Sequence, residues 1–97
     1  MTPAFHLLYH PKVKTDDIPR LSPDVALRVR KSIEERLAFD PEKFGFPLRK
    51  GLRGYRKLRL GDYRVIYRIE QKTLKILMIG HRKDVYEKAP KRFFTGD

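Results

Sequence analysis

The sequence contains no cysteine among its 97 residues, which excludes disulfide bonds, cysteine-ligated zinc and a thiol nucleophile. It has no apolar run close to the roughly 20 residues that a membrane-spanning helix requires. The first ten residues carry neither a basic start nor a long apolar segment, so we expect no secretory signal peptide. These absences predict a cytoplasmic protein. The length predicts a single domain over residues 1–97 and excludes a multidomain enzyme with a separate cofactor domain.

Acidic residues are scarce in the second half of the chain. Residues 49–97 hold 15 Lys and Arg against 5 Asp and Glu, a net charge of +10, whereas residues 1–48 hold 8 against 7. Because a metal nuclease gathers several carboxylates around Mg²⁺, we expect neither a metal site nor another cofactor. His6 and His10 are four residues apart but lack a third ligand, so both are expected to be structural. The one-sided charge instead favours nucleic acid or the ribosome as the partner, with an anionic membrane or an acidic protein as the alternatives.

The first half of the chain predicts a strand followed by helices. An aromatic and aliphatic run over residues 4–9 indicates an opening strand, and the polar residues 12–20 form either a short helix or an irregular link. Ser22 can cap a helix that starts at Pro23. Apolar residues then recur at every fourth position, which indicates one helix to about Phe39: Val25, Val29, Ile33 and Leu37.

The hydrophobic period changes from four to two in the second half. Residues 55–60, 63–70 and 73–80 predict three strands joined by tight turns. Alternation places the basic residues of the middle strand, Arg64 and Arg68, on one face of the sheet. The sequence therefore predicts an α+β fold with an N-terminal strand, a helical hairpin, an antiparallel three-stranded meander forming one sheet, and a short basic C-terminal tail.

Lys, Arg and Tyr side chains gather on one predicted sheet face and at the end of the last strand. Cleavage of RNA by its own 2′-OH requires deprotonation of that hydroxyl, stabilisation of the charged transition state and a proton for the departing 5′-oxygen. Lys and Arg stabilise such charge, and a Lys or Tyr surrounded by positive charge can exchange protons. The same residues also suit phosphate binding without catalysis. The residue types alone therefore leave binding and catalysis open.

Three blocks of the sequence resemble the RelE branch of the RelE/ParE toxin superfamily. They are PLRKGLRGYRKLR at 47–59, GDYRVIYR at 61–68 and GHRKDVY at 80–86. The resemblance implies a toxin of a type II toxin–antitoxin system, a ribosome-dependent endoribonuclease that cuts mRNA in the A site by metal-independent attack of the 2′-OH and so inhibits translation. The implied partners are a cognate antitoxin with an acidic or amphipathic segment, the ribosome and mRNA, with no membrane.

The resemblance also assigns residues. Lys57 corresponds to a basic residue that assists 2′-OH activation or charge stabilisation, and Arg64 to the arginine that holds the scissile phosphate. Arg82 corresponds to an arginine that stabilises or protonates the leaving group, and Tyr86 to a tyrosine near the 2′-OH and the flipped base. The residues expected to bind RNA are Arg53, Arg56, Arg59, Arg68, His81 and Lys83.

The chain departs from the family pattern in three respects. The segment between Arg82 and Tyr86 is shorter than in some members, and His81 stands where other members can carry a different basic residue. Well-studied members carry a second lysine two positions before the one matching Lys57, and this chain has Tyr55 there. His81 is expected to be either a proton shuttle or a cap to the strand that precedes it. Two alternatives remain: a ParE-like gyrase poison on the same fold without nuclease activity, and a non-catalytic RNA-binding module. Retention of Arg82 and Tyr86 after the last strand favours the nuclease over the gyrase poison.

Overall fold

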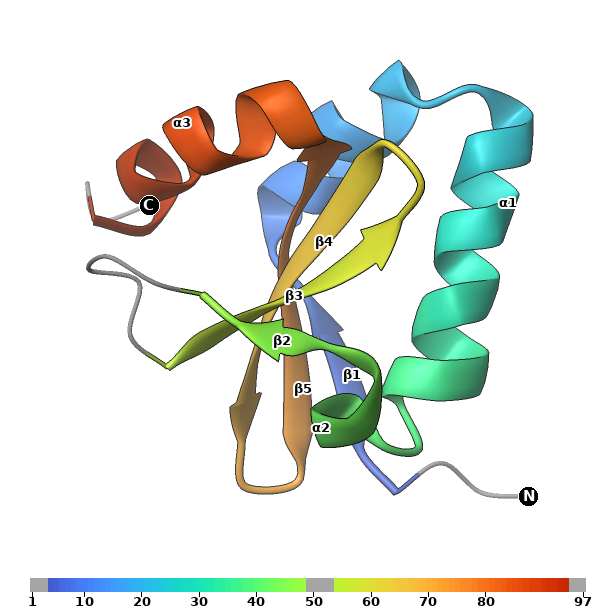
Figure 1. The fold of residues 1–97 in the computed structure, drawn as a ribbon, viewed down its shortest axis with the longest axis vertical. Coiled ribbons are helices and arrows are strands. Elements are labelled where there is room, and N and C mark those ends of the chain that lie inside the picture. Colours follow the sequence, from blue (N-terminus) through green and yellow to red (C-terminus); the bar gives the residue numbers. More distant parts are fainter. Residues whose placement is uncertain (1–3, 49–53, 95–97) are drawn as a thin grey trace.

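The structure, a computed structural model, describes residues 4–48 and 54–94, apart from the side chain of the last of these. Its elements form an α+β fold, as predicted (Figure 1). They follow in the order β1 (His6–Tyr9), η1 (Val13–Asp17), η2 (Ile18–Arg20), α1 (Pro23–Ser32), η3 (Ile33–Leu37), α2 (Pro41–Phe44), β2 (Phe46–Pro47), β3 (Tyr55–Leu60), β4 (Tyr63–Glu70), β5 (Thr73–His81) and α3 (Arg82–Phe94). Of the helical segments that are described, none is long and apolar enough to cross a bilayer.

The predicted three-stranded meander is confirmed, and two further strands widen it. The strand order is β1-β5-β4-β3-β2, with β1 parallel to β5 and every other pair antiparallel. The opening strand therefore pairs with the last strand, which places the apolar β5 between β1 and β4. Both meander turns occur where predicted, and both contain a residue with positive φ, Gly61 at 60° and Gln71 at 55°. Such turns match the right-handed twist of paired strands.

Helical segments precede the meander, and α1 covers one face of the sheet (Figure 1). The predicted cap is present, since the Val25 N–H donates to Ser22 Oγ at 3.3 Å. The π-helical η3 continues α1 to Leu37, and Asp40 then caps the short α2 through a bond from the Lys43 N–H. The polar link before α1 is helical, π-helical in η1 and 3₁₀ in η2. The buried core on this face consists of Val13, Val29, Ile33, Leu37, Leu58, Val65, Tyr67, Leu74, Ile76 and Ile79.

The segment predicted as a short tail is the 13-residue helix α3. It lies on the sheet face opposite α1 (Figure 1). Val85 and Ala89 of α3 form a second buried cluster with Ile66 and Met78 of the sheet, and the Phe93 ring stacks on Tyr55 with centroids 4.9 Å apart. Inward residues at every fourth position thus make this segment a packed helix, despite the proline at position 90.

One buried ion pair ties α3 to the rest of the protein. The Arg92 guanidinium donates to both carboxylate oxygens of Asp17, at 2.8 and 3.0 Å. It also donates to the Leu77 carbonyl at 3.0 Å, while Asp17 accepts from the Ile79 N–H at 2.8 Å. Both backbone groups lie on β5 beyond Ile76, the last residue paired with β1. Asp17 and Arg92 therefore take the place of a strand along this stretch of β5.

Candidate functional site

The four residues predicted to be catalytic come from β3, β4 and α3, which meet at one end of the sheet. Lys57 on β3 and Arg64 on β4 point to the face that α3 covers, because each is in register with a residue of that face. Arg82 and Tyr86 lie one helical turn apart at the start of α3. The Arg82 N–H donates to the Asp62 carbonyl at 2.7 Å, which fixes the start of α3 against the β3–β4 turn.

Lys57 and Tyr86 are in direct contact. The Lys57 ammonium lies 5.3 Å from the centroid of the Tyr86 ring, within the range of a cation–π interaction. The tyrosine is 38% exposed, so part of its surface remains open to solvent beside the Lys57 ammonium. An exposed aromatic ring of this kind can stack on an unpaired base.

Arg64 is buried without a carboxylate partner. It is only 6% exposed, and its Nη1 donates to the carbonyls of Gly61 and Tyr63 at 2.7 and 2.8 Å. Within residues 4–48 and 54–94 no carboxylate lies within ion-pair distance of it, and its neighbour across the β3–β4 ladder is another arginine, Arg59. Because buried charges in proteins are normally paired, this arrangement is suited to an anion that arrives from outside.

Arg82 is held more loosely. Its Nε lies 3.5 Å from Asp62 Oδ1, and the side chains are 54% and 67% exposed. An ion pair this exposed is weak, so a phosphate can displace the carboxylate. The amino end of α3 adds a partial positive charge at the same place.

Of the residues predicted to bind RNA, two lie near this cluster. Arg59 is exposed and in register with Arg64, and Lys83 is exposed in the first turn of α3. Arg53 lies outside the described residues. His81 lies edge-on to Tyr63 at 5.7 Å, and its Nδ1 accepts from the Lys83 N–H at 3.1 Å. Its contacts are therefore those of a cap on α3 rather than of a cap to the strand β5.

Arg56 and Arg68 do not join the cluster. Arg56 points to the α1 side of the sheet, where its guanidinium donates to the Glu42 and Gly45 carbonyls at 3.0 Å each and so holds α2 in place. Arg68 lies toward the far end of the same face as Arg64, over the Tyr55 ring and 3.5 Å from Glu70. Strand alternation sends Arg56 to the opposite face, and distance along β4 separates Arg68 from the cluster.

The cluster of Lys57, Arg59, Arg64, Arg82 and Tyr86 can stabilise negative charge on a phosphate and offers protons from an ammonium and a phenol. Among the described residues no group of three or more His, Asp or Glu side chains could hold a metal ion. Two further basic residues, Arg20 and Lys88, face a separate cavity that no sequence motif indicates. Their one signal in the sequence is the general excess of basic residues.

Comparison with known proteins shows the family of the chain. Residues 9–86 match the model of the family described as ParE toxin of type II toxin-antitoxin system, parDE. Toxin RelG of Mycobacterium tuberculosis is 36% identical over 74 residues, which are 74% of this chain and 85% of that protein. Toxin RelE of the same organism is 33% identical over 78 residues, 78% of this chain and 80% of that protein.

Solved structures agree with this assignment. The toxin of the toxin–antitoxin complex RelBE2 from M. tuberculosis superposes with a TM-score of 0.75 at 30% identity, covering 84% of this chain and 100% of that one. A variant of Escherichia coli toxin RelE in the free state has a TM-score of 0.71 at 22% identity over 93% and 98% of the two chains, and shares the fold. The protein belongs to the RelE/ParE superfamily of type II toxin–antitoxin toxins, in its RelE branch.

Proposed function

We propose that this toxin is a ribosome-dependent endoribonuclease that cleaves mRNA in the A site through metal-independent attack of the 2′-OH. The buried Arg64, which has no carboxylate partner in the described part of the chain, is the observation that carries the proposal. A guanidinium held in this way by two carbonyls is pre-oriented for a phosphate. The free-energy cost of burying its charge without a counter-ion in the free protein is offset when the anion binds.

In the proposed reaction the 2′-oxygen attacks phosphorus while the bond from phosphorus to the 5′-oxygen breaks. The products are a 2′,3′-cyclic phosphate and a free 5′-hydroxyl. Arg64 and Arg59 hold the scissile phosphate and stabilise its extra negative charge in the transition state. The Tyr86 hydroxyl oxygen accepts the proton of the 2′-OH as its own proton passes to water, and the Lys57 ammonium beside the ring stabilises the negative charge that develops there. Arg82 stabilises the leaving 5′-oxygen, which takes up a proton from water.

The proposed partners follow from the same surface. The net charge of +11 supports the ribosome and mRNA as partners, and a toxin that acts on them would work in the cytoplasm. It also calls for an antitoxin with an acidic or amphipathic segment that neutralises the basic surface. The M. tuberculosis relative was solved as a toxin–antitoxin complex, which supports a cognate antitoxin for this chain.

Cell-free translation with primer extension of the mRNA tests the proposal. The unsubstituted toxin should produce cuts within A-site codons only when ribosomes are present. Arg82→Ala and Tyr86→Ala should each lower cleavage by about 10²-fold or more, because each removes a group that acts in the transition state. Arg36→Ala, which removes an exposed arginine from η3, is the matched control and should cleave normally. Intact mRNA with the unsubstituted toxin would refute the nuclease.

The name of the matching family favours one competing function. A ParE-like toxin would act on gyrase and would not need the Lys57–Tyr86 pair or a buried Arg64 that lacks a carboxylate partner among the described residues. A supercoiling assay with purified gyrase distinguishes the two functions. We expect no inhibition of gyrase at toxin concentrations that cleave mRNA completely, and inhibition without cleavage would favour the alternative.

A further inference from the structure

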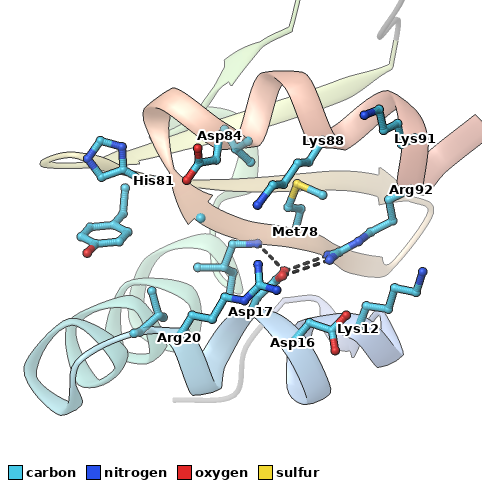
Figure 2. Close-up of a pocket in the computed structure, with 15 residues that line it drawn as sticks. Lys12, Asp16, Asp17, Arg20, Met78, His81, Asp84, Lys88, Lys91 and Arg92 are labelled. Carbon is cyan, nitrogen blue, oxygen red and sulfur yellow. Dashed lines mark hydrogen bonds and ion pairs between the residues drawn. The ribbon is translucent and has the colours of Figure 1, made fainter.

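A cavity of about 650 Å³ lies between η1–η2 and α3 (Figure 2). Residues of α3 form one wall, η1 and η2 form the facing wall, and the end of β5 forms the floor. The charged or titratable side chains that line it are Lys12, Asp16, Asp17, Arg20, Tyr63, His81, Asp84, Lys88, Lys91 and Arg92. Its size is within the range of ligand sites in proteins.

The Asp17–Arg92 pair at the base of the cavity is already satisfied. Both oxygens of Asp17 accept from Arg92, and one also accepts from the Ile79 N–H. Asp17 therefore has little remaining capacity to neutralise another cation. Four other basic side chains then face two carboxylates, those of Asp16 and Asp84, which leaves the cavity positively charged.

The side chains of Arg20 and Lys88 are directed toward the same part of the cavity (Figure 2). In Figure 2 the two side chains point from opposite walls toward the space beside Asp17. Within the described ranges, neither side chain has an ion pair or a hydrogen bond. Two cations directed at one space without counter-ions form a site for an anion, and a guanidinium with an ammonium suits phosphate oxygens.

His81 lies at one end of the cavity. Its Nδ1 accepts from the Lys83 N–H at 3.1 Å, so the residue that caps α3 also contributes to the wall of the cavity.

The helical spacing places the cavity and the candidate site on opposite flanks of α3. Tyr86 lies on the flank facing Lys57, whereas Asp84 and Lys88, one turn apart, lie on the flank facing η1 and η2. A polyanion that crosses α3 would therefore contact both sites. Since the proposed substrate of the candidate site is RNA, an RNA backbone that reaches both flanks is favoured over an acidic peptide as the occupant of the cavity.

We propose that this cavity is a second RNA-binding site, in which Arg20 and Lys88 bind a backbone phosphate while the reacting nucleotide occupies the candidate site. The inference rests on the proposed function and deepens it. The site contributes affinity and position without taking part in the cleavage step, since none of its side chains lies in the Lys57–Arg64–Arg82–Tyr86 cluster.

The test is binding of a single-stranded RNA of about 12 nucleotides, a length within the range of known single-strand sites. Its 2′-O-methyl groups prevent cleavage, and affinity is measured from 50 to 200 mM salt. Each lost phosphate contact lowers the slope of log K against log salt by about 0.7. We therefore expect the Arg20→Ala/Lys88→Ala protein to lose about 1.4 from the slope and about 25-fold in affinity at 0.1 M salt. The control Arg28→Ala/Lys31→Ala removes the same charges from exposed positions of α1 and should change both quantities much less.

The outcomes separate the two proposals. Failure of the unsubstituted toxin to bind RNA would overturn the site together with the proposed function. RNA binding that is equal in the cavity variant and the control, with normal cleavage by the unsubstituted toxin, would overturn the site alone. Amide chemical shifts of Gly80, His81 and Lys88 distinguish the phosphate sources. Shifts caused by ATP but not by the RNA would assign the cavity to a free nucleotide, and weaker antitoxin binding with unchanged RNA binding would assign it to an acidic peptide.

Discussion

Arg92 and Asp17 are 75 residues apart in the sequence and form a bidentate ion pair whose side chains are only 10% and 7% exposed. The pair is the polar contact that holds the end of α3 against η1 and β5. Since α3 also carries Arg82 and Tyr86, the same pair helps to hold the candidate site together.

Asp17→Ala should lower the free energy of unfolding by about 3–5 kcal/mol, because it leaves a buried guanidinium without its counter-charge. Chemical denaturation measures the loss. The double variant Asp17→Ala/Arg92→Met is the control, and it should recover a large part of that stability since no unpaired charge remains. A loss below 1 kcal/mol for Asp17→Ala alone would contradict the structural role given to the pair.

Arg64→Ala and Arg82→Ala should separate stability from activity. Arg82 makes only one long, exposed ion pair, so its substitution should lower cleavage while changing the free energy of unfolding by less than about 1 kcal/mol. Arg64 is buried and satisfies two carbonyls, so its substitution should lower cleavage and also cost about 1–3 kcal/mol. Urea unfolding measures the stability of each variant, and primer extension measures its cleavage. Equal losses of stability in the two variants would contradict the burial of Arg64 and the exposure of Arg82.

Gly45→Ala should destabilise the protein for steric reasons alone. Gly45 has extended backbone angles that any residue can adopt, but an added Cβ would overlap the Tyr67 hydroxyl and lie 2.8 Å from the Lys57 carbonyl oxygen. Overpacking of this kind costs about 1–3 kcal/mol or more. Gly80→Ala is the matched control, because its Cβ would meet Val85 at an ordinary 3.9 Å. Thermal or urea unfolding should therefore distinguish the two, and similar stabilities would be inconsistent with the packing around Tyr67.

Alkaline pH should weaken the fold through Tyr67. Burial raises the pKa of this phenol above its ordinary value of about 10, and the hydrogen bond from Arg56 lowers it in part. The unfolded chain then loses the proton first, so stability is complete below pH 10 and is lost as pH rises through the folded pKa. Tyr67→Phe should make the decline above pH 10 shallower by up to about 1.4 kcal/mol per pH unit. At pH 6 to 8 the free energies of unfolding of the two proteins should differ by a constant amount, which is the contribution of the hydrogen bond to the Pro41 carbonyl. Equal slopes of stability against pH above pH 10 would show that Tyr67 is not the cause of the alkaline decline.

The sequence predicts the meander well because its signals are local. Two-residue turns at Gly61 and Gln71 and the alternation of side chains give β3 and β4 their bounds and faces. In β5 a register shift interrupts the alternation, so that Ile76 and Met78 lie on opposite faces of the sheet. The partnership of β1 with β5 is not a local property, since it joins His6 to Thr73 across the whole chain. Nothing in the composition of residues 4–9 indicates whether that strand lies at an edge or beside the last strand.

The candidate site was predictable where strand alternation or the family resemblance applied. Lys57 and Arg64 share a face by register, and Tyr86 meets Lys57 as expected for parts of one site. Helix α3 was harder to predict because Pro90 argues against a helix, although Val85 and Ala89 carry the helical spacing. The Asp17–Arg92 pair has no sequence signature, since it depends on how two distant elements pack.

The parallel pairing of β1 with β5 has a consequence for synthesis of the toxin. β1 is made first, but its partner residues begin at Thr73, so the nascent chain cannot close its sheet until most of the protein has been translated. At roughly 5–20 residues per second this delay lasts about 3 to 13 s. Arg82 and Tyr86 follow later still. Under the proposed function, a nascent chain therefore lacks a complete cleavage site until late in translation, and an antitoxin already present in the cell has this time to meet each new molecule as it folds.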